Sequence, residues 1–175
     1  MKPEDVVDFW MAAGPSRWFT RDSAFDGSLA VRFGDALKVA RDGACDHWGK
    51  TLEGALGLVL LLDQVSRNIH RGSPLAFAAD SRALRLTRGW IARGYLQKFP
   101  APQARWFLMP LEHAEDLDAQ HRCVALFRTL GLSDMAHWAQ IHLDIIARFG
   151  RFPHRNAVLG RQSTADEVAF LNAGS

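Results

Sequence analysis

The stretch that decides the fold is Thr51-Leu-Glu-Gly-Ala-Leu-Gly-Leu-Val-Leu-Leu-Leu-Asp-Gln-Val-Ser-Arg-Asn-Ile69. Its apolar residues recur at the spacing of an α-helix, and every position from Leu58 to Leu62 is apolar. A helix that is apolar on every side belongs in the interior of a domain rather than on its surface. We therefore expect a central helix over residues 51–69, with other helices packed around it.

The rest of the chain repeats this helical spacing. No segment combines sustained two-residue alternation with flanking turn residues, as strands would. Ser73-Pro74 is typical of a helix start, and Thr164-Ala-Asp-Glu167 is a capping box. We predict an all-α fold, an array of helical hairpins. The expected helices cover residues 3–12, 22–41, 51–69, 74–93, 102–130 with an interruption near Pro110, 134–149 and 164–172.

Length and cysteine usage bound the class of protein. At 175 residues the chain is most simply a single domain over 1–175, long enough to bury a core of its own. Cys45 and Cys123 show neither redox nor metal-ligand spacing, which is typical of proteins from a reducing compartment. We expect a cytoplasmic protein that needs no cofactor.

Two classes of partner are disfavoured by the pattern of charge and hydropathy. The N-terminus is acidic where a signal peptide is basic, and no apolar run reaches the length of a membrane span. The formal net charge is only +2, so we interpret the arginines of segment 74–93 as a solvated helix face. Neither a membrane nor a nucleic acid is an expected partner.

Polar residues occur on helix faces that should be buried. On a helical wheel Asp63 and Arg67 share the stripe of Leu60, so an acid and a guanidinium four residues apart can pair there. Gln64 and Asn68 lie beside them. An unpaired charge on such a face would be very costly, so pairing is expected.

Two later helices repeat this pattern. In the expected helix over 134–149, Trp138, Ile141, Ile145 and Phe149 define the predicted inward stripe, with His142 at its centre. In the helix that follows Pro110, His113 and Gln120 share a face with Leu117, Val124 and Phe127. We therefore predict that His142 is buried and that His113 and Gln120 point inward.

The segment Phe149-Gly-Arg-Phe-Pro-His-Arg-Asn-Ala-Val-Leu-Gly-Arg161 interleaves charged and apolar residues more densely than any other. Because buried polar groups must find partners, we expect this segment to close over the polar residues of the helices. The predicted constellation comprises Asp63, Gln64, Arg67, Asn68, His113, Gln120, His142, Arg151, His154, Arg155 and Asn156.

Three motifs resemble the signature of a bacterial domain-of-unknown-function family. They are Leu62-Asp-Gln-Val-Ser-Arg-Asn-Ile-His-Arg-Gly72, Met109-Pro-Leu-Glu-His-Ala-Glu115 and Phe149-Gly-Arg-Phe-Pro-His-Arg-Asn156. The likeness extends over nearly the whole chain. It implies a tetratricopeptide-like, superhelical all-α fold, and it brings no assigned reaction, substrate or cofactor.

The chain departs from the pattern of that family at two places. Val65-Ser66 stands where the family has Phe-Pro, and Ala114 stands where it has serine. The second departure argues against serine chemistry at position 114.

Three interpretations of the constellation remain open. In the leading one, Arg67, Arg151, Arg155 and Asn156 bind an anionic small molecule or an acidic peptide, with Gln64, Asn68 and Gln120 as further ligand-binding residues. In the second, the arginines only neutralise Asp63, Glu112 and Glu115, and the protein is an interaction scaffold.

The third interpretation is an enzyme. A histidine, His113, His142 or His154, would act as general base, oriented by Asp63 or Glu115. These histidines and acids lack any recognised metal-ligand spacing, so we expect no metal site.

Overall fold

The computed structural model describes residues 1–174, and these residues are all-α, with no strand among them. They form two compact units. Unit 1 comprises Met1–Arg71 and Leu75–Pro110, and unit 2 comprises Gly72–Pro74 and the residues from Leu111 onward. The all-α prediction is confirmed. The single domain and the tetratricopeptide-like superhelix stay predictions, and each unit is described by itself.

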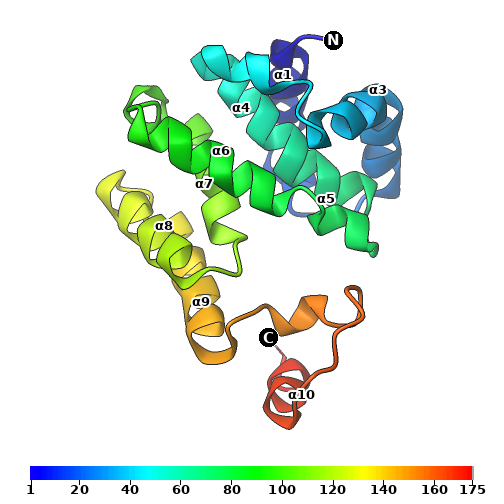
Figure 1. Cartoon of the computed structure of the whole chain (residues 1–175), viewed down its shortest axis with the longest axis vertical. Coiled ribbons are helices and arrows are strands. Elements are labelled where there is room, and N and C mark those ends of the chain that lie inside the picture. Colours follow the sequence, from blue (N-terminus) through cyan, green and yellow to red (C-terminus); the bar gives the residue numbers. More distant parts are fainter. Residues whose placement is uncertain (175) are drawn as a thin grey trace. The chain divides into compact units, whose positions relative to one another are not determined.

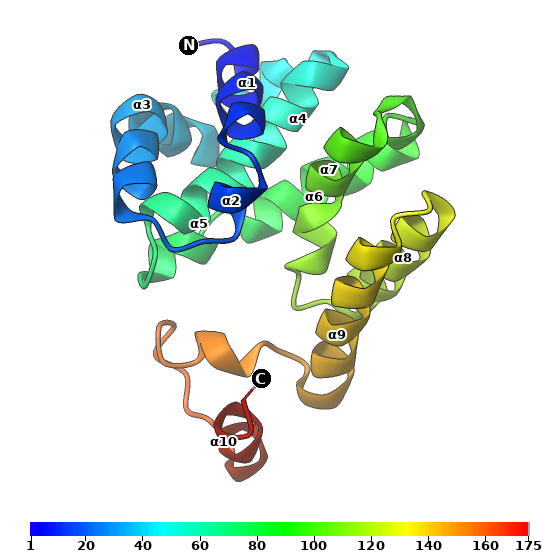
Figure 2. The same cartoon turned by 180° about the vertical axis from the view of Figure 1, so that it is seen from behind.

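Unit 1 is built around the segment that the sequence places in the interior. Gly54 to Leu62 are all buried, in α4 and the start of the π-helical turn η2, which continues into α5 (Figure 1). The helix α1 lies along α4 (Figure 2), while α3 packs against η2 and α5. The helical elements of unit 1 are α1 (Pro3–Ala13), α2 (Pro15–Trp18), α3 (Ser23–Arg41), η1 (Asp46–Lys50), α4 (Leu52–Leu60), η2 (Leu61–Val65), α5 (Ser66–Ile69), η3 (Pro74–Phe77, whose first residue belongs to unit 2), α6 (Asp80–Ala92), η4 (Leu96–Lys98) and most of α7 (Ala101–Glu112).

The main part of unit 2 begins with the last two residues of α7. Its main feature is an antiparallel hairpin of α8 (Leu117–Thr129) and α9 (Ser133–Phe149), which pack side by side (Figure 1). The C-terminal segment follows as η5 (Pro153–Arg155) and α10 (Ala165–Asn172). Thr164 and Glu167 form the expected capping box at the start of α10.

Two expected helix boundaries differ from the structure. Pro110 lies inside α7, and the break comes after Glu112, because Asp116 caps the next helix by accepting a hydrogen bond from the backbone N–H of Ala119 at 2.8 Å. The expected helix over 74–93 is also divided. A 3₁₀ turn over Pro74–Phe77 precedes α6, which begins at Asp80.

The predicted inward stripe of α9 is wrong. Trp138 is 57% exposed and Ile141 is 37% exposed, whereas Ala139, Leu143 and Ile146 are buried against the rest of the chain. The helix is therefore rotated from the predicted setting, with its small and medium residues inward. His142 lies at the edge of the buried face and keeps 27% of its side chain exposed, so the prediction that it is buried is wrong.

Candidate functional site

In unit 1 the expected pair of Asp63 and Arg67 is present. Nη1 of Arg67 lies 3.0 Å from Oδ1 of Asp63, whose side chain is 1% exposed, and it also donates to the Asp63 carbonyl oxygen. Gln64 donates from Nε2 to the other carboxylate oxygen of Asp63 at 2.7 Å. Sequence reasoning missed Asp80, which accepts two bonds from the same guanidinium, at 3.0 and 2.9 Å.

These contacts also decide the charge state of Arg67. Burial alone would lower the pKa of its guanidinium, but the charges of Asp63 and Asp80 raise it above the usual value. Asn68 lies next to this cluster and accepts a bond from Arg71, which pairs with Asp26 of α3. Arg67 and Arg71 are thus bonded to carboxylates of their own unit, as the internal-network interpretation expects.

In unit 2 the C-terminal segment is fixed by Arg151 and Glu167. Nε and Nη2 of Arg151 donate to the two carboxylate oxygens of Glu167, at 2.6 and 2.8 Å. Asn156 donates to Glu167 and to Ser163, and the backbone N–H of Thr164 completes the set at 2.7 Å. The Arg151 and Thr164 bonds lower the pKa of Glu167 to about 2. Arg151 and Asn156, expected as anion ligands, are therefore bonded to a carboxylate of the chain itself.

A second arginine ties the same segment to the loop after α7. Arg161 donates to both carboxylate oxygens of Glu115, at 2.7 and 2.9 Å, and the backbone N–H of Phe152 donates to Glu115 at 2.8 Å. Desolvation by itself would raise the pKa of Glu115, but these bonds outweigh it and lower the pKa. Glu115 is thus held by Arg161 and by the backbone of Phe152.

The histidine partner is Glu112, which is only 4% exposed. Nδ1 of His142 lies 3.0 Å from Oε1 of Glu112, although the ring N–H is not aligned for a regular hydrogen bond. Glu112 is the last residue of α7 and His142 lies in the middle of α9. From the sequence, Glu112 is expected only as a charge that the arginines neutralise. The sequence offered one signal for a pairing of Glu112 with a histidine, which is its position next to His113 at the end of a helix.

Two imidazoles of unit 2, those of His142 and His154, lie against the buried ring of Phe152, and His113 lies next to His142. The ring centres of His142 and His154 lie 5.4 and 5.5 Å from that of Phe152, and the rings of His113 and His142 are 6.4 Å apart and perpendicular. Arg155 stacks 4.4 Å above Phe152 and donates to the carbonyl oxygen of His113. Three histidines from separate parts of the sequence therefore lie close together. We call His113, His142 and His154 the histidine cluster.

The protonation state of His154 is set by this surrounding. Desolvation by the protein atoms around the ring, together with the charge of Arg155, lowers the pKa of His154 to about 4. The residue as a whole is nevertheless exposed at the surface. His154 is therefore a neutral imidazole at pH 7, able both to donate and to accept a hydrogen bond.

Two buried acceptor oxygens beside the histidine cluster have no donor among residues 1–174. They are Oε2 of Glu112 and Oε1 of Gln120. The amide of Gln120 donates to the carbonyl oxygens of Glu112 and Ala114, which holds the link between α7 and α8 in place. Buried acceptors normally have partners, and both of these oxygens are closed off from solvent.

The residues predicted from sequence thus fall into two groups. Asp63, Gln64, Arg67 and Asn68 lie in unit 1, and the other members of the constellation lie in unit 2. That the two groups meet stays a prediction. Within residues 1–174, no three His, Cys, Asp or Glu side chains are placed to hold a metal ion. No helix of that range is both long and apolar enough to cross a membrane.

Cysteine chemistry has little support at the histidine cluster. Cys45 and Cys123 are both buried free thiols. Burial and the neighbouring charge of Glu112 raise the pKa of Cys123 well above its usual value, so it stays a thiol at pH 7. Ala114, at the position where a serine was expected, is buried as well.

A shallow hollow of about 390 Å³ lies between the end of α9 and the start of α10. It is lined by Arg148, Phe149, Arg151, Thr164, Asp166 and Glu167. Its two arginines are matched by two acids on the same wall, and Arg151 is already bonded to Glu167. The hollow is therefore a weaker candidate for an anion site than its arginines alone suggest.

The comparisons with known proteins agree on the family and leave the activity open. The chain is similar to a solved protein of unknown function from Agrobacterium tumefaciens, with 42% identity and a TM-score of 0.93 over 98% of this chain and 97% of that one. No curated protein matches it significantly. The family described as "Bacterial protein of unknown function (DUF924)" matches residues 6–175. The chain therefore belongs to the DUF924 family of bacterial proteins.

Proposed function

We propose that the protein is an enzyme that moves protons, with His142 as general base and Glu112 as the carboxylate that orients it. The observation that carries the proposal is the distance of 3.0 Å between Nδ1 of His142 and Oε1 of the buried Glu112. A carboxylate this close to Nδ1 supports the imidazolium that forms when Nε2 accepts a proton.

The difference in exposure between the two residues supports these roles. Glu112 is withdrawn from solvent, while His142 keeps about a quarter of its side chain exposed, at 27%. No hydrogen bond to Nε2 of His142 is made within residues 1–174, so this nitrogen is available to a substrate or to a water molecule. A base must be accessible and its orienting group need not be, and the pair meets both conditions.

The surroundings of the pair suit a small substrate that carries hydrogen-bond donors. Phe152 provides an apolar ring, and His113 and His154 provide polar groups around it. The neutral imidazole of His154, which lies at the surface, would exchange hydrogen bonds with amine or hydroxyl groups of the substrate. With the thiol of Cys123 protonated and no serine at 114, attack by a water molecule activated by His142 is the simplest reaction, which makes a hydrolase the favoured class.

Anion binding is the second candidate, and Arg155 is the residue that favours it. Arg155 is buried and stacked on Phe152 within the histidine cluster. The other arginines expected to bind an anion, Arg67 and Arg151, are already paired with carboxylates, which weakens this reading. In the enzyme, Arg155 would stabilise negative charge that develops on the substrate.

Chemical modification tests the proposal without a known substrate. Diethyl pyrocarbonate acylates unprotonated imidazoles, and mass spectrometry gives the rate for each histidine. We expect His142 to react at least as fast as the exposed His137 on the same helix, and to react more slowly in Glu112→Gln. Equal rates for His142 in the wild type and in Glu112→Gln would overturn the orienting role.

A screen with chromogenic esters, phosphoesters and amides tests catalysis itself. Loss of a general base typically costs about 10²- to 10⁴-fold in rate, so His142→Gln should lose nearly all activity. His137→Gln is the matched control on the surface of α9 and should keep it. An activity that survives in His142→Gln would contradict the proposal.

A further inference from the structure

The outer face of α9 carries apolar side chains that the chain itself leaves uncovered. Trp138 and Ile141 are exposed and Ile145 is half-buried. At about 100° per residue these three side chains fall within about 60° of one another, so they form one continuous stripe. An exposed tryptophan within an apolar stripe is typical of an interaction surface.

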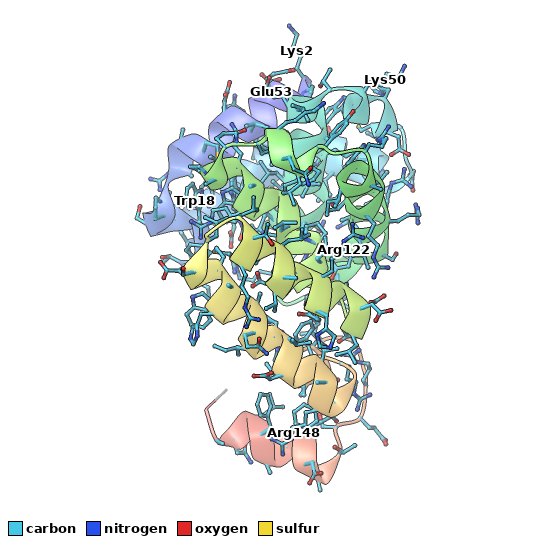
Figure 3. All side chains as sticks on the ribbon, turned by 90° about the vertical axis from the view of Figure 1, so that its left-hand side faces the viewer. Lys2, Trp18, Lys50, Glu53, Arg122 and Arg148 are labelled. Atoms are coloured by element: carbon cyan, nitrogen blue, oxygen red, sulfur yellow. The ribbon has the colours of Figure 1, made fainter. Side chains whose placement is uncertain are left out.

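Charged residues stand at both ends of this stripe, on the same face of the helix. Asp134 lies in its first turn and Arg148 in its last, and both are exposed. Among residues 1–174 neither has an ion-pair partner, and Arg148 only stacks on Phe149 and Phe170 (Figure 3 labels Arg148 beside α10). On the neighbouring face, by contrast, Gln140 bonds to both Arg128 and Asp144.

The stripe and its charges have the symmetry of a self-pairing surface. Asp134 and Arg148 are equally far from Ile141, and Trp138 and Ile145 are also nearly centred on it. Two copies of α9 related by a two-fold axis at Ile141 would run antiparallel. Asp134 of each copy would then face Arg148 of the other, and Trp138 would lie against Ile145 of the other.

We propose that this face of α9 binds a second copy of the chain, as an antiparallel helix pair centred on Ile141. The opposite charges at the two ends favour a second copy of the chain over another partner. A two-fold axis brings the acidic end of one stripe against the basic end of the other. The helix dipole accounts for an acid at the N-terminus and a base at the C-terminus. The dipole does not explain why Asp134 and Arg148 lie on the same face of the helix as the exposed Trp138.

The expected dimer is weak. A contact through one 17-residue helix is small beside the roughly 1,200–2,000 Å² of a typical stable interface, so association should depend on concentration. Sedimentation velocity from micromolar to submillimolar protein measures it. A wild-type chain that stays monomeric throughout this range overturns the proposal. That result would also be obtained if a different protein covers the stripe.

Charge reversal separates antiparallel pairing from other contacts. Asp134→Arg and Arg148→Asp each place like charges together. The dissociation constant of each variant's own dimer should therefore be higher than that of the wild type by about tenfold or more. Mixed in equal amounts, the two variants should associate again, because each supplies the charge that the other lacks. Single variants that dimerise like the wild type, or a mixture that stays monomeric, would contradict the geometry. Thermal melts followed by circular dichroism confirm that both variants are folded.

A cysteine at the two-fold axis gives an independent measurement. In Ile141→Cys the new thiols of two copies would meet, and mild oxidation should produce a covalent dimer. Ala147→Cys, exposed on another face of the same helix, is the matched control and should not. The natural thiols Cys45 and Cys123 are buried and do not compete. Equal cross-linking of both variants would overturn the proposed axis.

Discussion

Arg67 and Asp80 are joined by two parallel N–H···O bonds of 3.0 and 2.9 Å, and the same guanidinium lies 3.0 Å from Oδ1 of Asp63. One arginine thus neutralises an aspartate of the central helical segment and an aspartate at the start of α6. The two elements of unit 1 are held together through a single side chain.

Removal of that side chain should be costly, because Asp63 would be left as a buried charge. We expect Arg67→Ala to lower the free energy of unfolding by about 3–5 kcal/mol. Urea denaturation measures the change, with Arg85→Ala, an exposed arginine on α6, as the control that should be nearly neutral. A small effect of Arg67→Ala would show that Asp63 finds another partner or is protonated.

Two glycines of unit 1 should respond to alanine in opposite directions. A Cβ at Gly57 of α4 would lie 2.7 Å from the backbone oxygen of Pro3, so Gly57→Ala should push α1 away and destabilise by about 1–3 kcal/mol. A Cβ at Gly89 of α6 would meet nothing within 4 Å, and Gly89→Ala should stabilise by about 1 kcal/mol through helix propensity. Thermal and urea melts should show a loss of stability for Gly57→Ala and a gain for Gly89→Ala.

Acid should unfold the protein partly through Glu167. Its pKa is about 2 in the folded chain and about 4.5 when unperturbed, so the unfolded state binds the proton first as the pH falls. Its contribution to stability is complete above pH 4.5 and is lost between about 4.5 and 2. Glu167→Gln should reduce proton uptake on unfolding in this window by about one proton. Asp166→Asn, at the exposed neighbouring position, serves as the control.

His154 should titrate far below an ordinary histidine. Desolvation and Arg155 lower its pKa to about 4, from 6.5 when unperturbed, so stability falls as the pH drops from 6.5 to 4 and the unfolded state takes up the proton. An NMR titration of the imidazole protons should give a midpoint near 4 for His154. His154→Gln should remove this part of the pH dependence. A midpoint near 6.5 would contradict the desolvation.

The helices could be predicted from sequence because their signals are local. The capping box of Thr164 and Glu167 and the apolar run from Leu58 to Leu62 depend only on nearby residues. The pairing of Asp63 with Arg67 is of the same kind, since four residues along a helix bring the two side chains together. These predictions are confirmed.

The remaining contacts are set by packing between elements, which helical wheels do not describe. Asp80 and Glu112 lie on other helices than the residues they bond, and no spacing in the sequence connects them. The setting of α9 was mispredicted because hydrophobicity favours Trp138 inside, whereas the close approach of α8 and α9 selects small residues such as Ala139. Arg151 was assigned to an external anion because Glu167, sixteen residues away, was considered only as a cap.

The π-helical turn over Leu61–Val65 gives the central segment of unit 1 one residue more than a regular α-helix would have there. Such a turn is equivalent to a one-residue insertion, and its removal is equivalent to a deletion. A chain shortened by one residue within this turn would regain a continuous α-helix, but every residue after it would rotate by about 100°. Arg67 would then turn away from Asp80, so sequences that keep this ion pair must also keep the length of the turn.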